Sequence, residues 1–159
     1  MFRIFAAALA FLGALTLASA HEIKLGDLTI TDLWTRATPP GAPTAGGYMT
    51  IANAGSEEER LIAVSSPLAD HGELHSMQMK DGMMIMRPVA GGIIIPAGGK
   101  VSLDPDGLHI MFVGPKEPLK EGGKFPVTLT FAKAGKIDTF MHILAIGAKG
   151  PASMPAMKM

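Results

Sequence analysis

The sequence predicts an all-β protein that folds as an antiparallel β-sandwich or barrel. Short segments rich in apolar residues recur along the chain, and glycine or proline separates them. After the first twenty residues, no segment spaces its apolar residues with the period of a helix. The sequence shows no internal repeat and no linker between domains, so a single domain of about ten short strands is expected.

The first segment is predicted to be a signal peptide that takes no part in the fold. Arg3 gives a positive start, residues 4–17 form an apolar run, and the small residues at 18–20 are typical of a cleavage site. The run is too short for a permanent membrane span, and a retained N-terminal anchor is the alternative. Cleavage after Ala20 implies an exported protein, with a folded domain over residues 21–146 and a flexible tail over residues 147–159.

The first part of the domain is predicted to hold two loops and several strands. Residues 22–38 carry alternating apolar side chains on both sides of Gly26-Asp27, which predicts a short hairpin or a bulged strand. Residues 38–47 contain three prolines and three glycines and are predicted to be a surface loop. Strands are expected at residues 48–53 and 61–65, and residues 66–72 are interpreted as a connector.

Asp81-Gly82 is the strongest turn signal in the chain, because both central residues of a type I′ hairpin need positive φ. Counting outward from this turn fixes the pairing of the flanking strands. Side chains alternate along a strand. One face of the hairpin should therefore carry His75, Met77, Met79, Met84 and Met86. Residues that lie diagonally across a hairpin are within reach of long side chains, so these groups can converge on one point.

The second half of the domain alternates strands and turns. Asp104-Pro-Asp-Gly107 predicts a turn in which proline presets φ and glycine supplies a positive φ. The strand after this turn would place His109 and Met111 on one face. The strands of this half are expected at residues 93–95, 100–103, 108–113, 125–131 and 137–146.

The composition excludes several classes of function. Lys and Arg balance Asp and Glu at 14 each, which argues against nucleic acid or an anionic membrane surface as partner. The chain has no cysteine, so disulfides, a blue-copper centre and an iron–sulfur cluster are excluded. No nucleophile elbow, carboxylate pair or phosphate-binding loop supports an enzyme. Twelve methionines against one tryptophan and one tyrosine remain to be explained.

Imidazoles and thioethers on adjoining strand faces predict a binding site for copper(I), which is a soft cation. Thioether sulfur carries no proton, whereas imidazole must be neutral to bind, so acid should weaken the site. Neutral imidazoles and thioethers add no charge and therefore suit a monovalent ion. Zinc more often binds thiolate or carboxylate.

At His75, Met86, His109 and Met111 the pattern resembles the PCuAC family of periplasmic copper(I) chaperones. The family signature is His-x10-Met-x21-His-x-Met, which this chain matches except that its middle spacer has 22 residues. Similar segments, such as residues 32–41, extend the resemblance over residues 28–146. The resemblance implies a cupredoxin-like Greek-key sandwich in which these four residues bind one copper(I).

The resemblance also implies a function, which is the delivery of copper(I) for assembly of the binuclear copper site of cytochrome c oxidase. The expected partners are the oxidase subunit that carries this site and a Sco-type copper protein. The alternative is a periplasmic copper-buffering or resistance protein without a dedicated client. An adhesion or interaction domain with a methionine-rich core would bind no metal, and no enzymatic activity is expected.

Several residues near the predicted site have two interpretations. Met77, Met79 and Met84, taken singly, are more typical of core filling than of copper ligands. His71 could share the face of His75 or lie in a surface connector.

Other residues lie away from these strands. His142 is interpreted as a structural histidine, and Trp34 with Arg36 as a buried ring beside a cation. Cleavage after Ala20 would give His21 a free amine, which with its imidazole could chelate a second copper as copper(II). An enzyme that used this chelate would need a second histidine beside it. The tail methionines could also hold copper or be disordered; they are Met154, Met157 and Met159.

Overall fold

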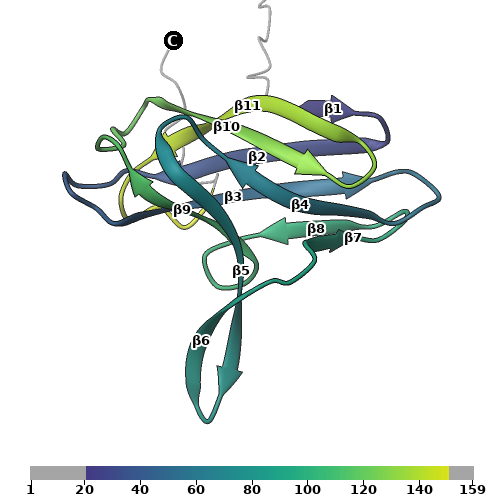
Figure 1. Cartoon of the computed structure of the whole chain (residues 1–159), viewed down its shortest axis with the longest axis horizontal. Helices are drawn as coiled ribbons and strands as arrows, with labels where there is room; N and C mark the ends of the chain where they lie inside the picture. Colours follow the sequence, from purple (N-terminus) through teal and green to yellow (C-terminus); the bar gives the residue numbers. More distant parts are fainter. Residues whose placement is uncertain (1–20, 151–159) are drawn as a thin grey trace, which may run out of the picture.

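A computed structural model describes residues 21–150, and this part of the chain is built from eleven strands with no helix (Figure 1). The strands are β1 (Ile23–Leu25), β2 (Leu28–Arg36), β3 (Thr44–Asn53), β4 (Glu59–Ser65), β5 (Ala69–Lys80), β6 (Met83–Pro88), β7 (Ile93–Ile95), β8 (Lys100–Leu103), β9 (His109–Pro115), β10 (Lys124–Phe131) and β11 (Gly135–Leu144). The all-β prediction is confirmed. The predicted signal peptide and the methionines Met154, Met157 and Met159 lie outside the described residues.

Hydrogen bonds join the strands in the order β6-β5-β9-β3-β2-β11-β10-β4-β7, with β1 attached to β2 and β8 to β3. Strands distant in this order share one core, since Ile93 of β7 belongs to the same buried cluster as Phe112 of β9. The sheet therefore folds over on itself as a sandwich. Connections such as β3 to β4 skip neighbouring strands, as Greek-key connections do. One pair departs from the predicted antiparallel pattern, because β11 runs parallel to β2.

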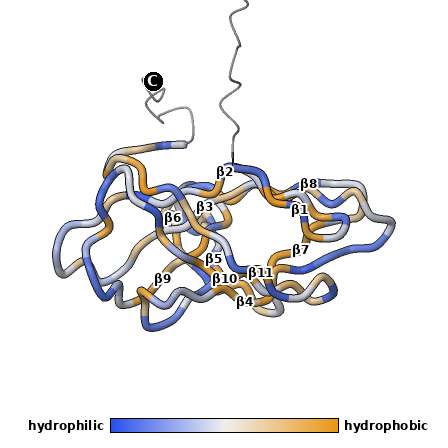
Figure 2. The backbone as a smooth tube through the Cα atoms, turned by 90° about the horizontal axis from the view of Figure 1, so that it is seen from above, coloured by the Kyte–Doolittle hydropathy of each residue, from blue (hydrophilic) through white to orange (hydrophobic). Residues whose placement is uncertain are grey.

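The core forms where apolar residues alternate. In β10, Phe125, Val127, Leu129 and Phe131 are all buried, as the predicted alternation requires. Figure 2 shows that the apolar stretches follow the strands through the middle of the body, whereas hydrophilic stretches lie mainly toward its two ends. Figure 1 shows the β5–β6 hairpin projecting away from this body.

The predicted loop at residues 38–47 is wrong at its end, because β3 begins at Thr44 and is a central strand. Two residues of this strand are glycines, and neighbouring side chains leave no room for a side chain at either position. A Cβ at Gly47 would come within 3.0 Å of the Phe112 ring and 3.1 Å of the Met141 sulfur, and one at Gly46 would collide with the Tyr48 side chain. Glycine here permits close packing rather than breaking the strand.

Two further boundaries differ from the prediction. β5 begins at Ala69, within the predicted connector, so the strand that carries the hairpin is twelve residues long. β11 ends at Leu144, and the chain then turns so that Ala148 packs in a buried cluster and its carbonyl oxygen accepts a hydrogen bond from Arg36. Ordered packing therefore continues two residues into the predicted tail.

The turn before β9 forms differently from the prediction. Gly107 does not have a positive φ. The Asp104 carboxylate instead accepts the N–H of Asp106 at 3.0 Å, and the Gly107 N–H donates to the Asp104 carbonyl oxygen at 3.3 Å. An Asx turn at Asp104 therefore forms this turn, without the positive φ that was predicted for Gly107.

The hairpin prediction is confirmed. Asp81 and Gly82 have φ values of 52° and 76°, and Met77 pairs with Met86 as counting from the turn requires. The type I′ turn therefore sets which side chains share a face with His75.

Candidate metal centre

Two histidines on neighbouring strands form the base of the candidate centre. His75 of β5 pairs directly with His109 of β9, and their ring centroids lie 5.8 Å apart. Their neighbours Leu74 and Ile110 belong to the core, so the two imidazoles lie on the outer face of the sheet. Both histidines are nevertheless almost buried, with 9% and 6% of their surface exposed.

Met86 of β6 brings the first sulfur to this pair. The register places Met86 diagonally across from His75, and its Sδ lies 2.6 Å from the Nδ1 of His75. Met86 is 41% exposed, so its thioether faces both the imidazole and solvent.

Met111 lies on the same face of β9 as His109, two residues further along the strand. It is half-buried and pairs with Glu73 on β5. The four residues predicted as ligands therefore come from three adjacent strands, β6, β5 and β9, and lie on one face.

Glu73 is a residue of the site that the sequence reasoning left unassigned. Its carboxylate oxygens lie 2.7 Å from the Nε2 of His75 and 2.9 Å from the Nε2 of His71. Hydrogen bonds from His71 and His75 lower the pKa of Glu73, so it is a carboxylate. Its spacing from His75 was the available signal, because residues two apart on a strand share a face.

These hydrogen bonds decide which ring nitrogens can bind a metal. A carboxylate only accepts hydrogen bonds, so the Nε2 of His75 carries the proton and its Nδ1 carries a lone pair toward Met86. The Nδ1 of His109 lies 3.0 Å from the Gly107 carbonyl oxygen, which also only accepts. The lone pair of the neutral His109 ring is therefore on Nε2.

The contact between His75 and Met86 has a chemical consequence. In the neutral ring, neither the Nδ1 of His75 nor the Sδ of Met86 has a proton to donate, although the two atoms lie 2.6 Å apart. Two facing lone pairs repel one another unless a cation binds both. Nitrogen with thioether sulfur is a donor set that suits soft copper(I).

Comparisons with known proteins agree with this fold. Residues 28–143 match the model of the family described as "Putative lipoprotein LpqE-like". The chain belongs to this LpqE-like family. It is 35% identical over 103 residues to "Putative lipoprotein Lxx21020" of Leifsonia xyli subsp. xyli (strain CTCB07), a match that covers 65% of this chain and 61% of that relative.

The solved structures confirm the resemblance to PCuAC domains and the cupredoxin-like sandwich. The copper-bound PCuAC domain of PmoF2 is 26% identical with a TM-score of 0.67, and the match covers 79% of this chain and 98% of that one. The apo PCuAC domain of PmoF1 matches with the same identity and TM-score, over 79% of this chain and 99% of that one. The copper(I) form of DR1885 from Deinococcus radiodurans is 28% identical with a TM-score of 0.55, and the match covers 84% of this chain and 83% of that one.

In this LpqE-like protein the remaining hairpin methionines are not in the core. Met79 is 67% exposed, Met84 is 48% exposed and Met77 is half-buried. The interpretation of these residues as core filling is therefore wrong. The hairpin projects from the body, so no second layer covers the face that they share (Figure 1). His71 lies on the face of His75, but it is exposed and contacts Glu73.

The other predicted residues lie on β2 and β11. Trp34 is buried against Tyr48, and Arg36 lies over the Tyr48 ring, which confirms the interpretation of a buried ring with a cation nearby. His142 is half-buried; burial, then the charges of His21 and Lys124, lower its pKa.

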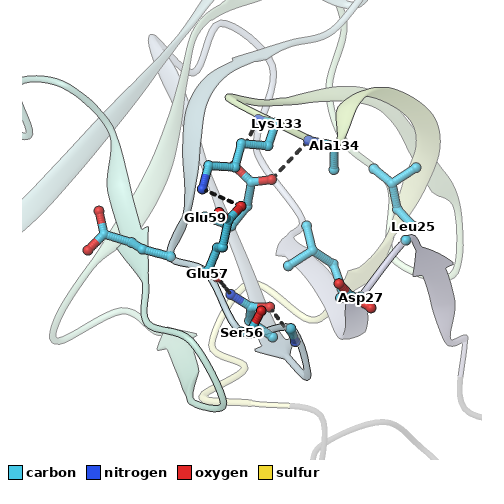
Figure 3. Close-up of a pocket in the computed structure, with 12 residues that line it drawn as sticks. Leu25, Asp27, Ser56, Glu57, Glu59, Lys133 and Ala134 are labelled. Atoms are coloured by element: carbon cyan, nitrogen blue, oxygen red, sulfur yellow. Dashed lines mark hydrogen bonds and ion pairs between the residues drawn. The ribbon is translucent and has the colours of Figure 1, made fainter.

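A hollow of about 290 Å³ lies at another part of the body, where Glu59 and Lys133 are among the residues that line it (Figure 3). The Glu59 carboxylate accepts the backbone N–H groups of Arg60, Lys133 and Ala134 at 2.8–3.0 Å. Burial raises the pKa of Glu59, but these hydrogen bonds outweigh burial and the net pKa is lowered. This carboxylate therefore fixes a turn of the fold.

Across residues 21–150, no group of three His, Asp or Glu side chains has a geometry that could hold a metal ion. Nor does this part of the chain contain a helix that is long and apolar enough to cross a membrane.

Proposed function

We propose that this protein is a periplasmic copper(I) chaperone that binds one copper(I) through His75, Met86, His109 and Met111. The observation that carries the proposal is the 2.6 Å separation between the Nδ1 of His75 and the Sδ of Met86, beside the ring of His109. The copper-bound PCuAC domain of PmoF2 and the copper(I) form of DR1885 support it, because this chain shares their fold.

The unequal exposure of the proposed ligands suits a carrier that must release its ion. His75 and His109 are almost buried, whereas Met86 is 41% exposed. A partner could therefore replace the thioether first and the imidazoles afterwards. Thioethers bind copper(I) without proton competition and resist oxidation better than thiols, which suits an oxidising compartment.

We further propose that the copper is delivered to the copper site of cytochrome c oxidase, directly or with a Sco-type protein. Export is supported by the predicted signal peptide and by the description of the relatives as lipoproteins. Deletion of the gene should lower oxidase activity when copper is scarce. Copper sensitivity with normal oxidase activity would instead support a buffering protein.

The site itself is tested by competition for copper(I) against a chromophoric chelator. One equivalent should bind to the wild type, and His109→Ala or Met86→Leu should each weaken binding by about tenfold or more. Met83→Leu is the matched control, because Met83 is an exposed methionine of the same strand on the opposite face. Equal binding by all four proteins would refute the assignment of these ligands, and absence of binding would refute the chaperone proposal.

A further inference from the structure

Beyond Met86, three more methionines continue along the hairpin toward its tip. Met77, Met79 and Met84 share one face with His75 and Met86, on the part of the molecule that projects from the body (Figure 1). Met79 is 67% exposed and Met84 is 48% exposed, so burial contributes little to keeping apolar side chains at these positions. Neither core packing nor the copper(I) site proposed above accounts for these three thioethers.

The strand register repeats, nearer the tip, the relation that joins His75 to Met86. His75 lies two residues before Met77, the partner of Met86, and its Nδ1 meets the Met86 Sδ diagonally across the hairpin. Met77 lies two residues before Met79, the partner of Met84. Met77 therefore has the same diagonal relation to Met84 that His75 has to Met86. One step toward the tip, two thioethers occupy the positions that an imidazole and a thioether occupy in the first site.

The directly opposite methionines are also close to one another. In a two-residue hairpin the residues that flank the turn form a hydrogen-bonded pair, and the two kinds of pair then alternate. The pairs Met77–Met86 and Met79–Met84 therefore both fall at non-hydrogen-bonded positions, where opposite Cα atoms are about 4.5 Å apart. Direct and diagonal neighbours together form a continuous zigzag of thioethers from His75 to the tip.

The charges of the hairpin leave this face open to a cation. Lys80 and Arg87 belong to the opposite face, because successive side chains along a strand point to opposite sides. Within residues 75–80 and 83–88, every charged side chain is therefore on the face away from the thioethers. Neutral thioethers suit the soft monovalent ion copper(I), whereas calcium and magnesium require oxygen ligands.

We propose that Met77, Met79 and Met84 form a second copper(I) site, through which the ion leaves the first one. The proposal rests on the proposed function, since the first site supplies the ion. Met77 faces Met86 directly and receives the ion first. The step is an exchange of one thioether ligand for another, and the metal stays copper(I) throughout. Because the second site has no imidazole and is open to water, it is weaker than the first and fills after it.

The competing explanation is that the exposed thioethers only offer an apolar surface to a partner. The double substitution Met79→Leu/Met84→Leu separates the two explanations, because leucine keeps an apolar side chain of similar volume and removes the sulfur. Both side chains are exposed, so the fold should tolerate the change. A purely apolar role predicts that copper(I) binding does not change.

The test is an anaerobic copper(I) titration of the chain from residue 21 to residue 159, with carbon-13 in the methionine methyl groups. This chain retains every described strand. Copper(I) is diamagnetic, so NMR follows each methyl signal as the ion binds. The first equivalent should shift the signals of Met86 and Met111, and the second should shift those of Met77, Met79 and Met84. Met83, an exposed methionine on the opposite face, should not shift.

The double variant Met79→Leu/Met84→Leu should bind the first equivalent as tightly as the wild type and the second about tenfold more weakly or worse. It should also pass the first equivalent to a chromophoric chelator about threefold more slowly or worse, because the exit step is lost. Met83→Leu is the matched control and should change none of these quantities.

The two proposals fail separately. An unmoved Met86 signal at one equivalent contradicts the first site, whereas unmoved Met79 and Met84 signals at two equivalents overturn the second. A second equivalent that shifts only the methionines beyond residue 150 would also overturn it. Equal transfer rates for the double variant and the wild type would overturn the role of the second site in release.

Discussion

The two histidine pairs have the same ring separation, 5.8 Å, but different surroundings. The pair His75 and His109 is almost buried, and it has a thioether at contact distance and a carboxylate behind one ring. The pair His21 and His142 is half-buried against Phe140 and has the Lys124 ammonium nearby. The distance between two imidazoles therefore does not define a metal site, and the neighbouring groups decide which ion is favoured.

The largest expected effect concerns Trp34 on β2, a strand that lies between the strands of His109 and His142 in the sheet. Trp34→Ala removes a side chain that is 3% exposed, and should lower the free energy of unfolding by about 3–5 kcal/mol. Denaturant unfolding measures this change, and Trp34→Phe should lose less. A loss below about 1 kcal/mol would mean that the pairs are not held apart by a rigid packed layer.

The next-largest effect is expected from replacing Met86, because the first pair, like the second, would then have no thioether beside it. Met86→His replaces the soft sulfur by an imidazole, so copper(I) affinity should fall between about ten- and a hundredfold and copper(II) should bind at the first pair. Copper(I) competition and copper(II) spectroscopy measure the two changes. Met84→His, on the same face but nearer the hairpin tip, is the control and should change neither. Equal effects of both substitutions would argue against Met86 as a ligand.

Glu73→Gln tests the carboxylate that distinguishes the first pair. It keeps an oxygen acceptor but removes the charge, and copper(I) affinity should fall about tenfold. The pKa of Glu73 is lowered, so its contribution is present above the ordinary carboxyl range and is lost only as pH falls through the lowered value. The difference from wild type should thus persist at about pH 5. Glu57→Gln, an exposed carboxylate elsewhere, is the control.

The smallest effect concerns the cation beside the second pair. Lys124→Gln removes a positive charge near Phe140 and His142, and should raise the pKa of His142 slightly at low salt, because the Lys124 charge lowers it. Copper(I) affinity should not change. A pH titration of the His142 ring protons by NMR at two salt concentrations measures the effect, which should shrink as salt increases. A lower pKa of His142 in this variant would contradict a repulsion between Lys124 and the His142 imidazolium.

Local rules were sufficient for the hairpin and its register. Asp81-Gly82 set the turn, the turn set the register, and the register put Met86 on the face of His75. The glycines of β3 were predicted to belong to a loop. Gly47 instead allows the close approach of Phe112 and Met141, which come from distant parts of the chain and could not be foreseen from local sequence.

The contact between the two histidines of the second pair could not be predicted from such local rules. The sequence singled out His21 only because cleavage after Ala20 would free its amine. His142 lies beside it through tertiary packing, which no spacing in the sequence predicts. The hairpin methionines were misassigned for a related reason, because alternation shows that they share a face but not whether anything covers it. Glu73 was missed although its alternation with His75 was visible.

The projecting hairpin has an evolutionary consequence. Its tip is defined by a two-residue turn, and the side chains of Met79, Met83 and Met84 are exposed rather than packed in the core. Substitutions there should alter the free energy of unfolding by no more than about 0.5 kcal/mol. As far as stability is concerned, the tip can therefore diverge rapidly among descendants of a common ancestor, while the body beneath it stays under the constraint of folding.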